Sequence, residues 1–593
     1  MSRRVITLFM WGYQEHFRFN FEYLLDSTLA VLGARDAGGA CLLVGAKIPG
    51  AQVEHEVCVE PEDGPCSVAL FAGMPAAIEK HITEHPLQRM FYGDEPSMRD
   101  KPENIRRDSI RQAVQDALAS YDVQTNVRSF AGRPAPVDGY YVVPVLQLPQ
   151  ALFTRYPPLR EPVTDGRFTG SPSLVHAVVG EVLKEAHDEL LRPDPGRSIG
   201  GRSASPMELA RRAASNFMYA PQIAIRDRLG SGGDLFERFN LISSLMYEGS
   251  EGKGRMLLAK LDGGAIDVSL QLAEPVPFHE ARWARKVLQM ASSDTALLAN
   301  TEHILGLGSI SAGTNPRETQ NVFEVEFHDH YHWSISSGGE VLLISRYGAP
   351  SLPNERIPME RLFDTFRRLF PEVIDQDVDA FAALFEVAVN QRHGSMLVVA
   401  SDAETEAERL SGQGTKIVPV KLTPELYRRV SNIDGTIIID PKCICHAVGV
   451  ILDGPANEHC TPSRGARYNS GIRYVAASDN PRLAVVVSDD RTVDVIPLLR
   501  PRIRRSAIEE HLAKLEASTI DDYHPWISWL DEHRFYLRQV ECDRVNAVYT
   551  RLRNAPREVG AMMIIREKFH PNPACTTDYF ESEGLDSNDD GGA

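Results

Sequence analysis

The sequence predicts a multidomain α/β protein: an α/β region, an α+β region, a second α/β unit built on a mixed sheet, and a helical tail. Its 593 residues exceed what one core can organise, because cores stop growing at about 250–300 residues. Segments with apolar residues at helical spacing alternate with short apolar runs typical of strands. Hydrophobic residues make up 43% and charged residues 24% of the chain, as in ordinary folded domains.

The first region, residues 1–200, is predicted to be α/β. Apolar residues recur at helical spacing from 15 to 32. The apolar runs VITLFM, ACLLVGA and YYVVPVLQL are typical of strands. The segment 192–206, RPDPGRSIGGRSASP, is rich in proline, glycine and serine. We therefore predict a domain boundary near residue 200.

The second region, residues 201–355, mixes helices and strands. A helix is expected from about 206 to 216, and RMLLAKL and AIDVSLQL are expected to pair through the turn Asp262-Gly263-Gly264. Helical HEARWARKVLQMA follows, and then the strand-like segments TALLAN, NVFEVEFHDHYHWSIS and EVLLISRY. The segment GAPSLPNERIP marks the expected end of this α+β region.

The third region, residues 356–505, begins with a helical pattern from 359 to 391. The strand-like pieces MLVVA, TIIID, AVGVIL, IRYVAAS and LAVVVS follow one another, as in a compact α/β unit. A helical region is predicted for 506–580, from RSAIEEHLAKLEA and WLDEHRFYLRQVECDRVNAVYTRLRN. The acidic, glycine-rich end, 581–593, is predicted to be disordered.

Composition and charge narrow the classes of function. No run approaches the ~18–20 apolar residues that span a bilayer, and the start lacks a secretory signal. A cytosolic protein is therefore expected. Eight irregularly spaced cysteines predict free thiols and no structural disulfide; they are Cys41, Cys58, Cys66, Cys443, Cys445, Cys460, Cys542 and Cys575.

The net charge of −18 repels polyanions and anionic membranes at long range. The best basic segment is LLRPRIRR, which contains Arg500, Arg502, Arg504 and Arg505. Its plain interpretation is a solvated linker before a helix. Nucleic-acid recognition is kept as a minor hypothesis, and no membrane partner is expected.

The strongest chemical signal is NIDGTIIID, in which Asp434 and Gly435 enter a strand. An aspartate at a strand mouth can hold a divalent ion or polarise a hydroxyl, and glycine lets the backbone pass close to a ligand. About thirty residues later, SRGARYNSGIRYVAASDNPRLAVVVSDD supplies Arg464, Arg467 and Arg473 around a glycine turn before a helix. Guanidinium groups and helix N-termini both favour phosphate oxygens. No P-loop sequence is present.

These segments resemble the diadenylate cyclase domain, the nucleotide-binding domain of the DNA-integrity scanning protein DisA. That family carries Asp-Gly-Ala, Gly-Thr-Arg-His-Arg and Ser-Glu-Glu motifs. The corresponding segments are Asp434-Gly435-Thr436, Gly465-Ala466-Arg467-Tyr468-Asn469 and Ser488-Asp489-Asp490. The resemblance implies two facing domains in a homo-oligomer. Each holds one ATP with Mg²⁺ or Mn²⁺, and together they condense two ATP molecules into cyclic di-AMP with loss of pyrophosphate.

By this resemblance, Asp434 orients the attacking hydroxyl or binds metal together with Asp489 and Asp490, and Arg467 is the second catalytic residue. Nucleotide contacts are expected from Gly435, Thr436, Arg464, Gly465, Tyr468, Asn469, Ser470 and Arg473. The phosphate turn departs from the pattern, because Ala466, Tyr468 and Asn469 replace a threonine, a histidine and an arginine. An alternative is therefore a degenerate domain that senses nucleotide and signals through oligomerisation.

The segment WGYQEHFRF, Trp11 to Phe19, resembles the start of a DACNV-like sensor region that accompanies some cyclase domains. The resemblance implies that the first 350 residues bind an unknown ligand and bias how two cyclase domains meet. The aromatic residues Trp11, Phe17 and Phe19 could stack a ligand, but core packing is the more common role at such positions.

Three further patterns have both plain and functional interpretations. His328, His330 and His332 alternate along a predicted strand and could bind a metal, but one strand alone surrounds an ion poorly. Zinc binding by Cys443, Cys445, His446, His459 and Cys460 is less favoured than core packing. The segments GLGSISAG and GSEGKGR are interpreted as loops rather than phosphate cradles.

Overall fold

The structure is a computed structural model in which two compact units, Met1–Glu355 and Arg356–Ala593, are each described by themselves. It describes residues 8–34, 37–62, 64, 66–159, 169–197, 204–225, 234–246, 252–261, 264–292, 294–311, 322–353, 357, 359–389, 391, 394–457, 459–461, 465–488, 493–519, 523–553 and 568–581. The finer division into five regions stays a prediction.

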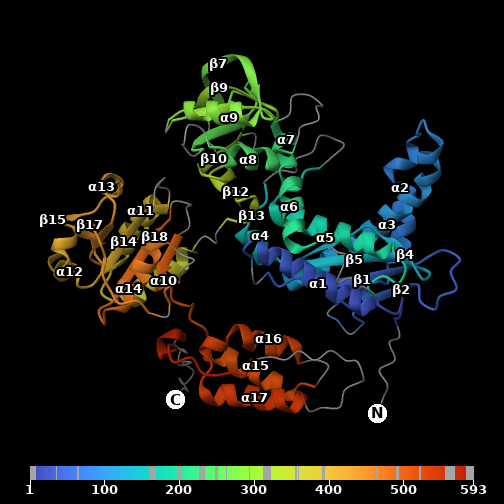
Figure 1. The fold of residues 1–593 in the computed structure, drawn as a ribbon. Helices are drawn as coiled ribbons and strands as arrows, with labels where there is room; N and C mark the ends of the chain where they lie inside the picture. The colour runs from blue at the N-terminus through green and yellow to red at the C-terminus, as the bar shows by residue number, and fades with distance from the viewer. Residues whose placement is uncertain are drawn as a thin grey trace, which may run out of the picture. The chain divides into compact units, whose positions relative to one another are not determined.

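The first unit opens with an antiparallel sheet of order β2-β1-β5-β3, in which β4 also pairs with β5 (Figure 1). The strands are β1 (Ala40–Lys47), β2 (Val57–Glu60), β3 (Val127–Ala131), β4 (Ala135–Val137) and β5 (Tyr140–Pro149). Both faces of β1 are buried, which explains why its sequence is a continuous apolar run. The expected strand VITLFM is not found at Leu8–Met10, and residues 5–7 lie outside the described residues.

Helices cover both faces of this sheet. Helices α1 (Gln14–Val31) and α5 (Leu174–Leu190) share a core with Leu43 and Cys41. Helices α2 (Met74–Glu84) and α3 (Glu95–Thr125) pack on the opposite face, against Leu42 and Val44. Shorter helices are α4 (Gln150–Arg155), α6 (Pro206–Phe217), α7 (Tyr219–Ile225) and α8 (Leu235–Ser244). Trp11 and Phe17 are buried in the first core, in agreement with a packing role.

The first unit also contains an eight-stranded sheet of order β13-β12-β11-β10-β6-β8-β9-β7. Its strands are β6 (Gly254–Ala259), β7 (Ile266–Pro277), β8 (Ala296–Ala299), β9 (His303–Ile310), β10 (Val322–Asp329), β11 (His332–Ser337), β12 (Glu340–Arg346) and β13 (Ala349–Ser351). Helix α9 (Ala281–Val287) follows β7.

The predicted hairpin between β6 and β7 is wrong. Strand β8 runs parallel to β6 and occupies the position beside it, whereas β7 pairs with β9. A central position suits β6, because Met256 to Ala259 are all buried. The segment GLGSISAG is also not a loop at its start, since Gly306 and Gly308 lie within β9. A side chain at Gly306 would collide with the backbone of Leu270, at 2.0 Å from its carbonyl oxygen.

The second unit is built on a six-stranded mixed sheet of order β15-β17-β16-β14-β18-β19. The strands are β14 (Ser395–Ala400), β15 (Thr415–Lys421), β16 (Thr436–Ile439), β17 (Ile444–Val450), β18 (Arg482–Val487) and β19 (Val493–Ile496). Within this sheet, only the β14–β16 pairing is parallel among the described pairs. The structure therefore confirms the predicted mixed-sheet α/β unit.

Helices lie on both faces of the mixed sheet (Figure 1). Helices α10 (Met359–Leu369), α11 (Asp375–Val389) and α13 (Pro424–Val430) share one core. Helices α12 (Ala403–Arg409) and α14 (Ala466–Ala476) contribute to the other.

The prediction of a strand at IRYVAAS is wrong, because this segment lies at the end of α14 and just beyond it. Its apolar residues serve a helix face: Gly471, Ile472 and Tyr474 are buried. Gly471 brings the helix close to the sheet, since a side chain there would contact Val486 at 3.4 Å. A short apolar run cannot distinguish a strand from one turn of a buried helix by periodicity alone.

The tail forms a helical cluster of α15 (Arg505–Ala517), α16 (His524–Glu532) and α17 (Gln539–Arg553). The second predicted helical segment is interrupted by a 3₁₀ turn, η6 (Arg534–Tyr536). Residues 577–581 return to the start of this region, where Phe580 bridges to Ile503. Of the end predicted to be disordered, 581–593, the structure describes Glu581, and residues 582–593 lie outside the described residues.

A buried arginine links this returning segment to α10. The Arg368 side chain is 2% exposed and donates to Asp364 at 3.1 Å and to Asp578 at 2.7 Å. It also donates to the carbonyl oxygen of Arg500 at 2.8 Å, and its guanidinium lies 4.5 Å from the Tyr579 ring centroid. A charge this buried is tolerated because it is paired and hydrogen-bonded.

Candidate functional site

The sequence-predicted site centres on Asp434, which immediately precedes β16. Its Oδ1 accepts hydrogen bonds from the Gly435 backbone N–H and from Arg467 Nη2, both at 3.1 Å. The Asp434 side chain is 90% exposed and that of Arg467 38%. The structure thus brings together two residues 33 positions apart in the sequence, and both are accessible to a ligand.

Two glycines bring the backbones of neighbouring strands together beside Asp434. Gly435 has φ +116°, and a Cβ there would lie 2.6 Å from the carbonyl carbon of Gly449, whose own φ is +64°. Thr436 follows and is fully buried, and its hydroxyl has no hydrogen-bond partner within the described part of the chain. The two glycines therefore let neighbouring strand backbones approach closely beside Asp434, with the Ile433 side chain packed against Gly449.

Replacement of Gly435 by alanine is expected to destabilise the protein by about 1–3 kcal/mol, because a positive φ and a backbone collision are imposed together. Chemical denaturation of the whole chain would measure the change. Gly412→Ala is the control, because a Cβ at Gly412 meets nothing within 4 Å. Equal stability of the two variants would contradict the backbone argument.

Helix α14 begins beside this strand mouth. Gly465 is its N-cap and has no side chain to cap the first turn, so the backbone N–H groups there favour an anion. Arg467 projects from that first turn to Asp434, and Tyr468 and Ser470 are half-buried. The local charge and the helix end both suit phosphate oxygens.

Asn469 has a different arrangement, because its amide ties the preceding loop to the helix. Its Oδ1 accepts from the Thr461 N–H, and its Nδ2 donates to the Thr461 carbonyl oxygen, each at 3.0 Å. A second contact from Nδ2 reaches the Gly465 carbonyl oxygen at 3.3 Å. A phosphate contact by Asn469 stays a prediction.

Arg473 lies farther along α14, six residues or about 9 Å from Arg467 at 1.5 Å rise per residue. It is near Cys460, whose pKa is lowered first by a hydrogen bond with the backbone at Asn457 and then by Arg473. The structure places Arg473 beside the loop rather than beside Asp434. Its expected contact with nucleotide therefore also stays a prediction.

Three predicted residues, Arg464, Asp489 and Asp490, lie outside the described residues. Among those that are described, no group of three or more histidine, cysteine or acidic side chains is placed to hold a metal ion. Asp434 is the predicted metal ligand that the structure describes, and its exposed carboxylate is chemically suited to a hard cation.

The three histidines of FHDHYHW do not project from one strand, so that expectation is wrong. Tyr331 has φ +55° and forms a tight turn between β10 and β11. His328 and His332 therefore pack against each other across a hairpin, with ring centroids 4.6 Å apart and ring planes tilted by 41°, and His332 contacts Asp329 at 3.3 Å. Cys443 and Cys445 are fully buried core residues, which agrees with the favoured packing interpretation.

The basic segment LLRPRIRR is neutralised within the second unit. Arg502 pairs with Asp578 at 2.7 Å and Arg505 with Glu541 at 3.1 Å, and Arg504 lies 4.0 Å from Glu581. Arg500 stacks over Phe535 at 4.9 Å. These partners favour a structural role over nucleic-acid recognition.

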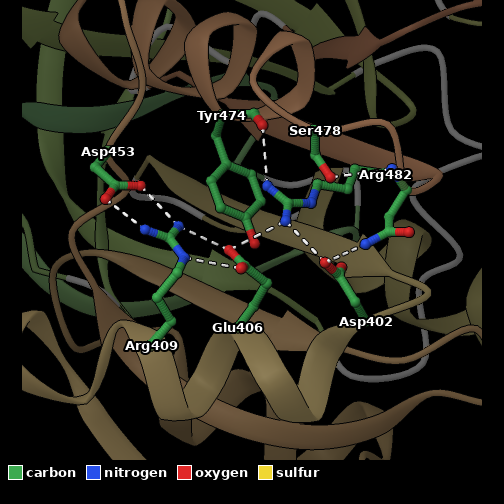
Figure 2. Close-up of polar contacts among 8 residues, drawn as sticks. Asp402, Glu406, Arg409, Asp453, Tyr474, Ser478 and Arg482 are labelled. Carbon is green, nitrogen blue, oxygen red and sulfur yellow. Dashed lines mark hydrogen bonds and ion pairs between the residues drawn. The ribbon is translucent and has the colours of Figure 1, made fainter.

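A charged network that no sequence motif indicates lies on the α12–α14 face of the sheet, shown in Figure 2. Arg482, the first residue of β18, pairs with Asp402 at 2.9 Å and with Glu406 at 3.2 Å. Its guanidinium lies 4.2 Å from the centroid of the fully buried Tyr474 ring. Arg409 extends the network from Glu406 to Asp453.

The network lowers the pKa of each of its carboxyl groups. Burial raises the pKa of Asp402, but hydrogen bonds from Arg482 and Asn480 outweigh burial and hold it below its ordinary value. Hydrogen bonds from Arg409 are the largest cause for Glu406 and for Asp453, and both pKa values are lowered. All three acids are therefore held in the charged form.

The first unit has an open polar cleft between α5, α6 and α8. Both arginines that line it are paired with acids: Arg212 contacts Glu181 at 2.8 Å and Glu185 at 2.7 Å, and Arg211 contacts Glu237 at 2.9 Å. The cleft therefore does not identify a ligand class. Among the described residues, no helix is long and apolar enough to cross a membrane.

Comparison with known proteins adds family assignments for three segments. Residues 383–496 match the family described as DisA bacterial checkpoint controller nucleotide-binding. Residues 10–218 match the family Probable sensor domain DACNG, and residues 233–338 match Probable sensor domain DACNH. The expected likeness of the N-terminal region to probable sensor families is thus confirmed, with DACNG and DACNH as the matching families in place of a DACNV-like one.

Two solved structures show partial likeness. A hypothetical membrane-spanning protein from Bacillus cereus is 18% identical, with 22% of this chain and 63% of that chain covered and a TM-score of 0.18. DacA from Staphylococcus aureus, solved as a double mutant, is 19% identical, with 23% and 94% covered and a TM-score of 0.17. The chain thus spans less than two thirds of the Bacillus cereus protein.

No curated protein matches the chain. The family matches nevertheless account for most of the first unit and for the core of the second. Along the chain, two successive segments that match the probable sensor families DACNG and DACNH precede a segment that matches the DisA nucleotide-binding family.

Proposed function

We propose that residues 356–505 act as a diadenylate cyclase, which condenses two ATP molecules into cyclic di-AMP and two pyrophosphates. The observation that carries this proposal is the contact between Asp434 and Arg467, at 3.1 Å, where a strand mouth meets a helix N-terminus. The contact lies within the segment that matches the DisA nucleotide-binding family. An accessible carboxylate beside a cation suits phosphoryl transfer, in which positioning and electrostatics supply most of the catalysis.

In this proposal each residue has a separate role. Arg467 and the first-turn N–H groups of α14 bind phosphate oxygens. Phosphate competes with Asp434 for the Arg467 guanidinium, which leaves the Asp434 carboxylate available to the ribose 3′-hydroxyl. Each 3′-hydroxyl attacks the α-phosphate of the opposite nucleotide and loses its proton, and pyrophosphate leaves. Gly435 lets the nucleotide approach the strand backbone.

A divalent cation, Mg²⁺ or Mn²⁺, fits the donors at this site. Magnesium is usually held by one or two carboxylates together with substrate phosphates rather than by a cage of side chains. Asp434 is one such carboxylate, with Asp489 and Asp490 proposed as further ligands. When bound, the cation would neutralise charge on the phosphates.

The reaction requires two copies of the chain, because the hydroxyl of one nucleotide must reach the α-phosphate of another. A homo-oligomer with facing cyclase domains is therefore part of the proposal. The sensor region, residues 1–355, would control activity if its ligand binds one arrangement of the domains more tightly than another. The protein is proposed to act in the cytoplasm.

A second candidate is a nucleotide-binding sensor that does not cyclise ATP and signals through its oligomeric state. It is favoured by the phosphate turn, where Ala466, Tyr468 and Asn469 replace the family's threonine, histidine and arginine. The Asn469 amide also bonds to Thr461 on both its oxygen and its nitrogen. Fewer cationic donors then face the triphosphate.

Incubation of the purified full chain with ATP and Mg²⁺ or Mn²⁺ tests the proposal. Cyclic di-AMP and pyrophosphate are the expected products, resolved by liquid chromatography and mass spectrometry. ATP binding without product, across both metals and a range of protein concentrations, would favour the sensor. Failure to bind ATP would contradict both candidates.

Replacement of Arg467 by alanine is expected to weaken ATP binding by about tenfold or more, because a charge-assisted hydrogen bond to phosphate contributes about 1.5–3 kcal/mol. Isothermal titration calorimetry would measure the affinity. Arg429→Ala is a suitable control, since Arg429 also forms an exposed ion pair, with Glu425 at 2.9 Å. Equal affinity in the two variants would remove Arg467 from the site.

A further inference from the structure

The loop 451–461 connects β17 to the segment before α14. At its start, the Ile451 N–H donates to the Gln413 carbonyl oxygen at 2.9 Å. Gly454 then packs on α14, where a Cβ would lie 2.7 Å from the Arg473 carbonyl oxygen. At the far end, Thr461 is held by Asn469. The described residues of this loop, 451–457 and 459–461, therefore contact α14 near its C-terminal end and in its first turn.

One side chain of this loop, Asp453, is held from outside by a two-pronged contact. Arg409 Nη1 donates to Asp453 Oδ2 at 2.6 Å, and Arg409 Nη2 donates to Asp453 Oδ1 at 2.8 Å. Isolated exposed ion pairs contribute little, but a bidentate pair also fixes geometry. Because the Asp453 side chain is 43% exposed, it can be changed without opening the core.

The other edge of the Arg409 guanidinium is fixed by the buried part of the network (Figure 2). Its Nε and Nη2 donate to Glu406, each at 2.8 Å. Glu406 is 4% exposed and also pairs with Arg482. Negative and positive charges thus alternate along the network, in the order Asp402, Arg482, Glu406, Arg409 and Asp453. The network therefore connects buried residues of the core to the surface loop that carries Asp453.

We infer that Arg409 and Asp453 are positioning residues for the nucleotide site: their bidentate pair fixes the loop 451–461 and thereby the first turn of α14 that carries Arg467. The expected effect of this pair on nucleotide affinity rests on the proposed function. Neither residue touches the Asp434–Arg467 contact, so any effect must travel through the loop. No local sequence motif marks the pair, because 44 residues separate its members.

Hydrogen exchange tests the structural half of the inference without any nucleotide. In Asp453→Ala, exchange is expected to accelerate by about three- to tenfold in peptides covering 451–461 and the first turn of α14, in line with the loss of one well-oriented ion pair. Arg367→Ala is the matched control, since Arg367 is 50% exposed and pairs with Asp375 at 2.9 Å on α10 and α11. Unchanged exchange in the first turn would overturn the inference.

A double-mutant cycle tests the functional half. Asp453→Ala is expected to weaken ATP binding by about threefold in the wild-type background and to have no further effect in Arg409→Ala. Arg409→Lys should not restore full affinity, because an ammonium cannot make both pairs of contacts. Thermal unfolding of Asp453→Ala should stay close to wild type, because the buried Glu406 keeps its contacts with Arg409 and Arg482, and this separates positioning from a general loss of stability.

The outcomes separate this inference from the proposed function. If the wild type binds no ATP, the proposed function fails, and exchange at the first turn of α14 alone decides whether the pair positions it. If ATP binds and the two substitutions act additively, or affinity is unchanged while the loop exchanges faster, the positioning role is overturned.

Discussion

Replacement of Asp434 by asparagine is expected to lower cyclic di-AMP formation by about 100-fold or more, because the charge that polarises the hydroxyl and attracts a cation is removed. Asparagine keeps the shape and one oxygen, so the contact with the Gly435 N–H, at 3.1 Å in the native protein, can persist. ATP affinity should change by only a few-fold. Product formation at saturating ATP, with either metal, would measure the effect.

A matched control for this prediction is Asp375→Asn. The Asp375 side chain is also 90% exposed and also pairs with an arginine, Arg367 at 2.9 Å, but it lies at the start of α11. Its replacement should leave product formation within about twofold, the range expected for an exposed pair. Retention of more than a third of the wild-type rate in Asp434→Asn would exclude a catalytic role for Asp434.

Replacement of Arg482 by alanine is expected to destabilise the second unit by about 3 kcal/mol, because removal of one partner of a buried ion pair leaves unpaired charge behind. The Arg482 side chain is 5% exposed, and Asp402 and Glu406 both depend on it. Its contact with the Tyr474 ring is lost as well. Urea denaturation at pH 7 would measure the free energy of unfolding.

The pH dependence gives this prediction a second readout. The pKa values of Asp402 and Glu406 are lowered in the folded protein from ordinary values of 3.8 and 4.5. Their contribution to stability is therefore present above the ordinary values and is lost as the pH falls through the folded ones. The difference between wild type and Arg482→Ala should stay constant from pH 7 to about pH 5 and narrow below about pH 4.

The exposed pair Arg367–Asp375 is again the control, and Arg367→Ala should cost less than about 1 kcal/mol. A cost below about 1 kcal/mol for Arg482→Ala, with no narrowing in acid, would mean that the network adds nothing to stability. Replacement by methionine would then show whether apolar packing alone suffices at this position.

The central geometry of the candidate site could be predicted from sequence because local signals mark it. Asp434 precedes a short apolar strand, and Arg467 follows a glycine at the start of a helix. Each signal marks the residue at which a strand or a helix begins, and sequence patterns indicate such starts well. That Asp434 and Arg467 lie together in space was expected from the family resemblance and not from periodicity.

The errors arose where tertiary contacts decide the structure. IRYVAAS carries β-branched and aromatic residues and no helix signal of its own, yet contacts with β18 place it at the end of a helix. Strands β6 and β7 have the sequence of a hairpin, but β8 pairs with β6 instead. The turn at Tyr331 contains no glycine to announce its positive φ.

The charged network could not have been predicted, because its members are individually ordinary. Arg409 and Asp453 are 44 residues apart, and Arg482 lies 80 residues from Asp402. An arginine before an apolar strand usually reads as a solvated end. Only the fold shows that Arg482 is buried between two carboxylates and an aromatic ring.

The contacts that surround the buried Arg368 decide which fragments of this protein can be produced in folded form. A fragment trimmed to the family match at 383–496 would omit both α10 and the returning segment that supplies Asp578 and Tyr579. A fragment that kept α10 but stopped after α15 would bury Arg368 without Asp578, its partner from the returning segment. Autonomous production of the second unit therefore calls for a boundary at about residue 356 and for retention of the chain through 581.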